Sequence, residues 1–220
     1  MTIAGPKTAT KKTLFTDATA GRDWNLCYYA VASNRNDNLH RLHALRGGTN
    51  ANDPSTGPYT YASRLVPPNF DQWAVDGSIL QLNGRLYLLF SGAPTTNPWR
   101  QNTYTSLMSS PTQLSGNAVM ISGPTFNWEM VGPPVHEGQE FIQVGGVTRI
   151  VYSASHCSSE DYIGSQPLHR DHPSKIVWVK SPNPIFGKNV AAGVYGSGHH
   201  FMFQFGTQWF FAYHGRAAQA

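Results

Sequence analysis

A short pattern recurs four times along the chain of 220 residues, each time as a glycine followed three positions later by a bulky residue and then by an apolar run. The copies are GRDWNLCYYA from Gly21, GRLYLLFSG from Gly84, GVTRIVYSAS from Gly146 and GTQWFFAYHG from Gly206. Successive copies start 63, 62 and 60 residues apart. A nearly constant period of this length indicates a repeat architecture, in which each period forms one structural unit.

Each period reads as a set of short strands. Three copies follow a matching stretch through a glycine turn, which predicts a β-hairpin; the stretches are DGSILQLN from Asp76, EGQEFIQVG from Glu137 and GHHFMFQF from Gly198. The rest of each period, such as NTYTSLMSS from Asn102, predicts further short strands between Pro, Ser and Asn residues. We therefore expect an all-β fold, a β-propeller with about four blades in this chain. A two-sheet sandwich explains the short strands but not the period.

The composition argues against several classes of partner and site. The chain has 16 Lys and Arg against 12 Asp and Glu, a formal charge of +4, and no basic stripe interleaved with aromatic residues, so nucleic acid is not an expected partner. No run of about 18 apolar residues is present for a membrane span. The opening MTIAGPKTATKK lacks the apolar core of a secretory signal. Cys27 and Cys157 allow at most one disulfide, and their surroundings do not indicate metal or redox chemistry.

Polar residues stand at similar places near the start of the three matching stretches. Asp76, Glu137 and His199 precede the next repeat glycine by 8, 9 and 7 residues. The innermost strand of a propeller blade lines the central channel, so we expect these side chains to face a common cavity. Carboxylates that converge from different strands suit glycoside hydrolysis, in which one acid protonates the leaving oxygen. The alternative is that Asp76-Gly77 and Glu137-Gly138 only begin strands, because such pairs are frequent at turns.

Longer motifs around these residues follow one another in a fixed order. They are DNLHRLHALRGG, QWAVDGSILQLNGRLYLLFSG, QNTYTSLMSSPTQLSG, GPTFNWEMVGPPVHEGQEF, YSASHCSSEDYIG and VYGSGHHFMF. Through them the chain resembles glycoside hydrolase family 43, whose members are five-bladed β-propeller enzymes that act on the α-L-arabinofuranosyl and β-xylosyl units of plant cell-wall polysaccharides. The resemblance runs from about Leu26 to Gly215.

The resemblance implies an inverting exo-α-L-arabinofuranosidase. Glu137 corresponds to the general acid, Asp76 to the residue that tunes its pKa and orients the sugar, and His199 to an imidazole near a Ca²⁺ ion held largely by water. The residues expected to contact substrate are Trp73, Phe126, His136 and Gln139. No organic cofactor is implied.

The resemblance also implies the partner and the compartment. We expect an oligo- or polysaccharide containing arabinose or xylose as the substrate, as in arabinan and xylan degradation, and an extracellular, monomeric protein. Two alternatives stay open: β-xylosidase specificity, and a non-catalytic sugar-binding propeller that has lost turnover.

The sequence departs from the family pattern at both ends. An inverting enzyme needs a general base, which the family carries in an Asp-Pro segment of its first blade, and no matching segment is found here. Asp17, Asp23 and Asp53 are poor substitutes, so the general base is not identified and we expect impaired hydrolysis. We interpret residues 1–20 as an unmatched leader and residues 21–220 as an incomplete propeller domain.

Overall fold

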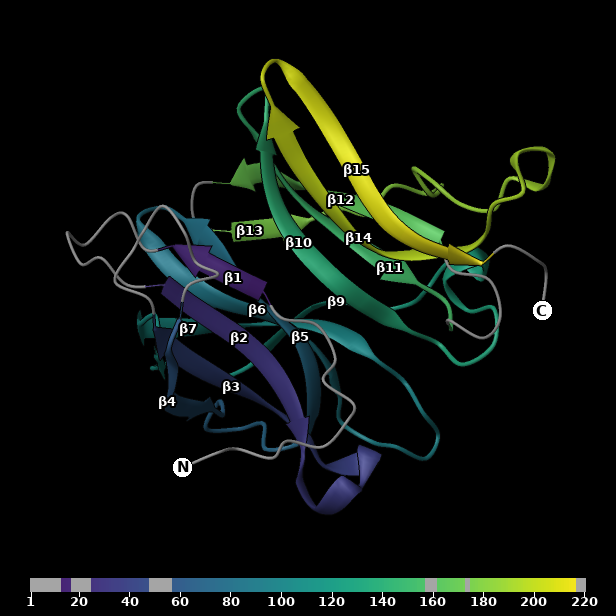
Figure 1. The fold of residues 1–220 in the computed structure, drawn as a ribbon. Coiled ribbons are helices and arrows are strands. Elements are labelled where there is room, and N and C mark those ends of the chain that lie inside the picture. Colours follow the sequence, from purple (N-terminus) through teal and green to yellow (C-terminus); the bar gives the residue numbers. More distant parts are fainter. Residues whose placement is uncertain (1–12, 17–24, 48–56, 157–161, 173–174, 217–220) are drawn as a thin grey trace. The chain divides into compact units, whose positions relative to one another are not determined.

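The structure is a computed structural model, and it describes residues 13–16, 25–47, 57–156, 162–172 and 175–216. Within these ranges the regular elements are strands, joined by loops and by short 3-10 helices (Figure 1). The all-β class predicted from the sequence is therefore confirmed.

The described strands form four sheets with antiparallel pairing. The first contains β1 (Thr13–Thr16), β2 (Asn25–Ala32), β3 (His40–Gly47) and β4 (Tyr59–Leu65), and the second contains β5 (Trp73–Leu82), β6 (Arg85–Ala93), β7 (Asn102–Ser110) and β8 (Gln113–Leu114), with β9 (Val119–Ser122) paired to β7. The third contains β10 (His136–Val144), β11 (Val147–Ala154), β12 (Tyr162–His172) and β13 (Lys175–Trp178), and the fourth contains β14 (Tyr195–Phe205) and β15 (Gln208–Arg216). These sheets succeed one another along the chain, as the repeat predicts, and a two-sheet sandwich does not account for them.

Three of the four repeat glycines lie in the predicted hairpin turns, and Gly21 lies outside the described residues. Between β5 and β6, Asn83 and Gly84 have φ values of 52° and 71°. Two central residues with positive φ are what a type I′ turn requires, and its twist matches that of the flanking strands. Gly146 lies in the turn between β10 and β11, and Gly206 in the turn between β14 and β15. The three hairpins expected from the sequence are thus confirmed.

The chain divides into two compact units. The first unit comprises residues 1–94 and 105–119. Within it, β5 contacts β2 and β3. The core includes Tyr28, Leu42 and Leu88, each no more than 1% exposed.

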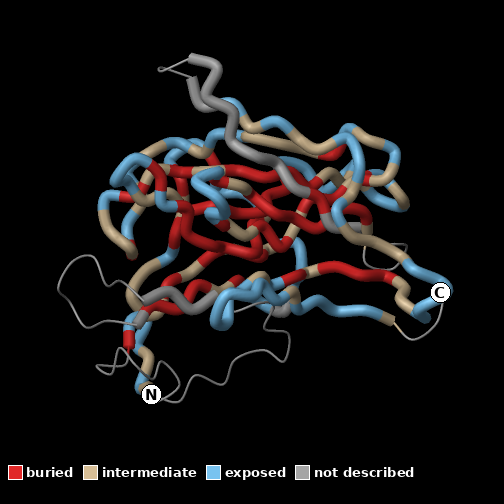
Figure 2. The backbone as a smooth tube through the Cα atoms, turned by 90° about the horizontal axis from the view of Figure 1, so that it is seen from above, coloured by how far each residue is buried: buried red, intermediate tan, exposed pale blue. Residues whose placement is uncertain are grey.

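The second unit comprises residues 95–104 and 120–220. Within it, β14 contacts β10, β11 and β12. Ile142 and Val151 form a buried cluster against which Phe186, Met202 and Phe211 pack. Figure 2 shows the buried residues as continuous stretches of the backbone.

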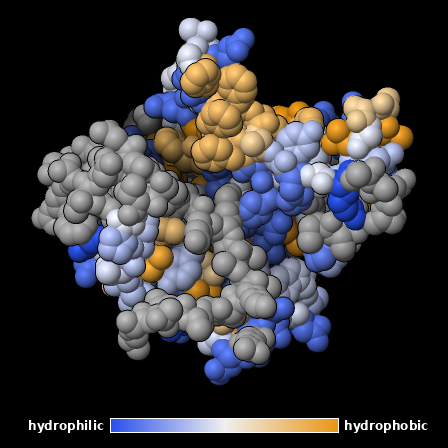
Figure 3. Space-filling view, in the orientation of Figure 1, coloured by the Kyte–Doolittle hydropathy of each residue, from blue (hydrophilic) through white to orange (hydrophobic). Residues whose placement is uncertain are grey.

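The fourth sheet exposes an aromatic surface. Phe201, Phe203 and Phe210 stack in sequence, with ring centroids 5.7 and 5.5 Å apart. Each of these side chains is at least 39% exposed, and Phe205 at the turn is 76% exposed. Figure 3 shows hydrophobic side chains gathered over this hairpin.

Several predictions concern the N-terminal part of the chain and the cysteines. β1 lies inside the segment interpreted as a leader, and it pairs with β2 from Thr13↔Tyr28 to Thr16↔Asn25. Cys27 is buried in β2. Asp17, Asp23, Asp53 and Cys157 lie outside the described residues. Among the described residues, no helix is long and apolar enough to cross a membrane.

Candidate active site

The first strand of three hairpins carries a β-bulge near its start. The bulges fall between Val75 and Ser78, between Glu137 and Glu140, and between Gly198 and Phe201. At each bulge one residue has positive φ: Asp76 at 54°, Gly138 at 60° and His199 at 44°. A bulge bends the strand and changes the direction of the side chains beside it, and bulges recur next to active sites. Each of the three predicted polar residues therefore lies at, or next to, a bulge of the same kind in its own sheet.

The position of the polar residue relative to the bulge differs by one residue in the third sheet. Asp76 and His199 are themselves the residues with positive φ, whereas Glu137 comes one position earlier and still pairs with Ser153. In the third sheet Gly138 takes the left-handed conformation instead, which is unfavourable for a residue with a Cβ atom. A Cβ at Gly138 would also lie 3.4 Å from the His199 Cα. The expected equivalence thus holds for Asp76 and His199 and is shifted by one residue for Glu137.

Glu137 is partly buried and receives a side-chain donor from Gln101. The Gln101 Nε2 donates to the Glu137 Oε2 at 3.4 Å, and Gln101 is 2% exposed. The backbone of Gln101 is fixed on both sides, because its N–H donates to the Pro134 carbonyl and its carbonyl accepts from the His136 N–H, both at 3.0 Å. The amide of Gln101 is therefore held beside the carboxylate of Glu137.

His136 and Gln139, predicted to contact substrate, are both fully buried. His136 Nε2 lies 3.0 Å from Glu129 Oε1, and its ring centroid is 4.3 Å from that of Tyr152. Gln139 donates to Thr103 Oγ1 at 3.2 Å and to the His136 carbonyl at 3.3 Å. Contact with substrate stays a prediction for both residues. Because alternate residues of a strand point to opposite faces and Gln139 lies within the bulge, these side chains point into the protein and support the strand that carries Glu137.

Glu129 is a buried carboxylate that the sequence did not single out. It ends the 3-10 helix η4 (Asn127–Glu129), and its side chain is 0% exposed. Oε1 accepts from His136 Nε2 and from the Tyr152 hydroxyl at 2.7 Å. Oε2 accepts from Lys180 Nζ at 2.5 Å and from the backbone N–H groups of Thr125 and Phe126 at 2.6 and 2.8 Å. A carboxylate with this many donors is satisfied despite its burial.

The electrostatics follow from these partners. Burial raises the pKa of Glu129, but the hydrogen bonds from His136, Lys180 and the Phe126 N–H, together with the charge that His136 carries when protonated, outweigh burial and hold that pKa well below its usual range. Burial lowers the pKa of His136, and the Glu129 carboxylate beside the ring opposes that shift only in part. Burial and the Glu129 charge raise the pKa of Tyr152, so its hydroxyl stays protonated. Glu129 is therefore held as a carboxylate, and it forms an ion pair with Lys180.

Phe126 and Trp128 lie on the same loop as Glu129. Their rings are stacked, with centroids 6.2 Å apart at an interplanar angle of 15°. Both side chains are partly exposed. Trp128 also stacks on Tyr152 at 6.3 Å and donates its indole N–H to the Pro182 carbonyl at 2.9 Å. Partly exposed aromatic rings can pack against a sugar ring.

In the first unit, Trp73 and Asp76 lie on β5. The indole N–H of Trp73 donates to the Asp37 carbonyl at 2.9 Å, and its ring meets that of His40 edge-on, with centroids 5.9 Å apart. Asp76 is 5% exposed. Its non-glycine positive φ is a strained conformation, of the kind that clusters at functional sites.

The calcium expectation centres on His199. Its backbone N–H donates to Ser153 Oγ at 2.6 Å, and its ring stacks on that of His214, with centroids 6.3 Å apart. Among the described residues, no three His, Cys, Asp or Glu side chains are grouped so that they could hold a metal ion. The calcium site stays a prediction.

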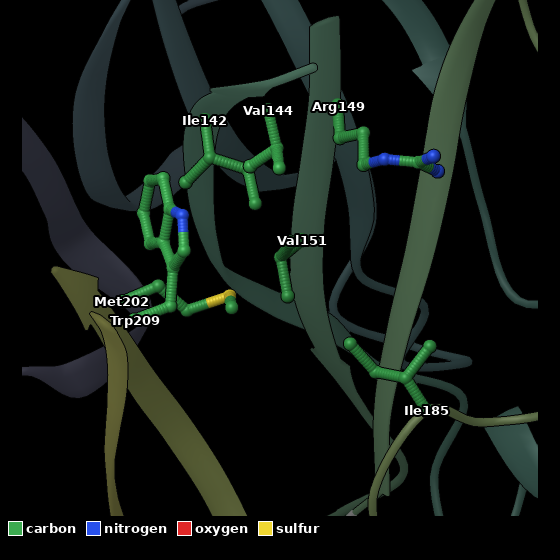
Figure 4. Close-up of a pocket in the computed structure, with 7 residues that line it drawn as sticks. All are labelled: Ile142, Val144, Arg149, Val151, Ile185, Met202 and Trp209. Carbon is green, nitrogen blue, oxygen red and sulfur yellow. The ribbon is translucent and has the colours of Figure 1, made fainter. Parts of the chain in front are cut away.

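An apolar cavity of about 290 Å³ lies between the third and fourth sheets (Figure 4). It is lined by Ile142, Val144, Arg149, Val151, Ile185, Met202 and Trp209. None of the residues predicted to act on substrate lines it. The candidate active site is therefore the group around Glu137, not this cavity.

The sequence profile of Glycosyl hydrolases family 43 matches residues 13–220. Over 175 residues the chain is 30% identical to an extracellular exo-α-(1→5)-L-arabinofuranosidase of Streptomyces avermitilis, which covers 79% of this chain and 36% of that protein. Over 158 residues it is 32% identical to α-L-arabinofuranosidase 43 of Humicola insolens, which covers 70% of this chain and 32% of that protein. The chain thus spans about a third of the length of these two relatives.

A solved structure gives the same fold. The crystal structure of α-L-arabinofuranosidase from Lactobacillus brevis matches with a TM-score of 0.80 at 21% identity, over 94% of this chain and 65% of that chain. This match confirms the predicted β-propeller fold class. Because the family profile spans nearly the whole chain, the protein belongs to Glycosyl hydrolases family 43.

Proposed function

We propose that this glycosidase is an exo-acting, inverting α-L-arabinofuranosidase in which Glu137 is the general acid. The observation that carries the proposal is the setting of Glu137, a partly buried carboxyl beside a bulge with the Gln101 amide held against it. The names of the two relatives, both arabinofuranosidases, favour arabinose over xylose as the sugar removed.

In the proposed reaction, Glu137 protonates the glycosidic oxygen as the bond to the anomeric carbon breaks. A second carboxylate removes a proton from the water that attacks the opposite face of the sugar. That base is not identified among the described residues. Asp76 is proposed to tune the pKa of Glu137 and to orient the sugar, on the strength of the family resemblance. The substrate class is an arabinose-containing oligo- or polysaccharide, and we propose an extracellular, monomeric protein.

The test compares two substrates whose leaving groups differ. The nitrophenolate group of a nitrophenyl arabinofuranoside leaves with little protonation. In α-1,5-linked arabinotriose the leaving sugar oxygen must be protonated by the general acid. Glu137→Gln is expected to slow arabinotriose hydrolysis by about 10²–10⁴-fold and nitrophenyl release much less. Glu140→Gln is the matched control, because Glu140 lies on the same strand and its Oε2 accepts from the Met202 N–H at 2.8 Å.

Equal losses on both substrates would refute Glu137 as the acid. A folded chain that binds arabinotriose without hydrolysing it would replace the proposal with the non-catalytic sugar-binding alternative.

A further inference from the structure

Lys180 is a partly buried cation that the family resemblance leaves without a role. It follows β13, and its side chain is 13% exposed. Its ammonium lies 4.7 Å from the centroid of the Phe126 ring. A cation at this distance over an aromatic face is attracted by the ring, more strongly when it is desolvated.

The three N–H groups of Lys180 reach one loop. Nζ donates to the Gly123 carbonyl at 2.8 Å, to Thr125 Oγ1 at 2.7 Å and to Glu129 Oε2 at 2.5 Å. These acceptors flank Phe126 on both sides in sequence. An ammonium has three donors and no acceptor, so all of its hydrogen-bonding capacity is directed at residues 123–129.

Glu129 joins this loop to the strand that carries Glu137. Its Oε2 accepts hydrogen bonds from Lys180 and the Phe126 N–H, and its Oε1 accepts one from His136, the residue before Glu137. The conformation of the loop is therefore set by charge-assisted contacts to the body of the second unit, which are about twice as strong as neutral ones.

We propose that Lys180 is a positioning residue that fixes the Phe126 ring as a platform for a pentose ring of the substrate. The inference rests on the proposed function, because it assumes that Phe126 meets the sugar. Lys180 itself does not touch the substrate. It acts through Phe126, so its removal should affect sugar affinity only while the Phe126 ring is present.

A double-mutant cycle tests this dependence. All four chains carry Glu137→Gln, which slows hydrolysis of arabinotriose; they are this background alone, with Phe126→Ala, with Lys180→Met and with both changes. The readout is the dissociation constant for arabinotriose by calorimetry. We expect each single change to weaken binding about tenfold, equivalent to about 1.4 kcal/mol, and the double variant to bind no worse than Phe126→Ala. Losses that multiply to about a hundredfold would mean independent action and would overturn the inference.

Lys188→Met serves as the matched control. Lys188 lies 5.8 Å from the centroid of the Tyr195 ring in the same unit, so it too is a lysine over an aromatic ring. The control should leave the dissociation constant unchanged. A loss of affinity equal to that of Lys180→Met would show a general effect of removing a lysine and would contradict the proposal.

A second readout needs no ligand. The backbone N–H groups of Thr125 and Phe126 are bound by Glu129 Oε2, so hydrogen exchange of a peptide covering 123–130 reports on the loop. Faster exchange in Lys180→Met is expected, and unchanged exchange would overturn the inference while leaving the proposed function intact. A wild-type chain that binds no arabinotriose would instead refute the proposed function, and the sugar-positioning role with it.

Discussion

Replacing Glu129 with glutamine tests a buried carboxylate that accepts hydrogen bonds from five donors. Glutamine keeps the shape but has one oxygen and one NH₂ group. The carboxylate accepts from five donors through its two oxygens, and a glutamine side chain can accept through only one of them. The change also removes the negative charge that pairs with Lys180. Disrupting a buried ion pair at one partner costs about 3–5 kcal/mol. For a chain of this size that lowers Tm by about 6–20 °C.

The measurement is urea unfolding followed by tryptophan fluorescence, with a thermal melt as a check. Asp71→Asn is the control: Asp71 pairs with Arg41 at 2.6 Å and with Arg64 at 2.5 Å, but its side chain is 55% exposed. An exposed pair contributes about 0–1 kcal/mol. If Glu129→Gln lowers the free energy of unfolding by less than about 1 kcal/mol, buried Glu129 contributes no more than an exposed ion pair does. That result would refute the reasoning from burial.

Three further predictions follow from the same contacts. Because the pKa of Glu129 is depressed, its contribution to stability is present above its ordinary pKa of 4.5 and is lost as the pH falls below that value; acid titration of unfolding should show a shallower loss in Glu129→Gln than in the wild type. Tyr152→Phe removes the hydroxyl that donates to Glu129 and should cost about 1.5–3 kcal/mol in urea unfolding. Gly164→Ala would place a Cβ 2.6 Å from both the Trp128 and the Tyr152 rings, so thermal melts should show clear destabilisation, and an unchanged Tm would contradict the packing of these rings.

The sequence by itself determined the strands, the hairpins and the approximate places of the polar residues. Period-2 patterns and glycine turns are local features, since a turn such as Asn83–Gly84 is specified by the conformations open to its own residues. The repeat then placed Asp76, Glu137 and His199 near the starts of comparable strands, which the structure confirms to within one residue.

Only the tertiary structure decided how these residues are supported. The bulge shifts Glu137 by one position, because Gly138 adopts the conformation that Asp76 adopts in its own sheet. His136 and Gln139 turned out to be buried, which a sequence motif cannot indicate when neighbouring residues of a strand face opposite sides.

The partners of the site are also distant in sequence. Lys180 and Glu129 are 51 residues apart, and Gln101 and Glu137 are 36 apart. Contacts over such separations depend on how the strands pack and leave no periodic trace in the chain. The sequence therefore identified the residues proposed for the chemistry, and the fold alone identified those that hold them in place.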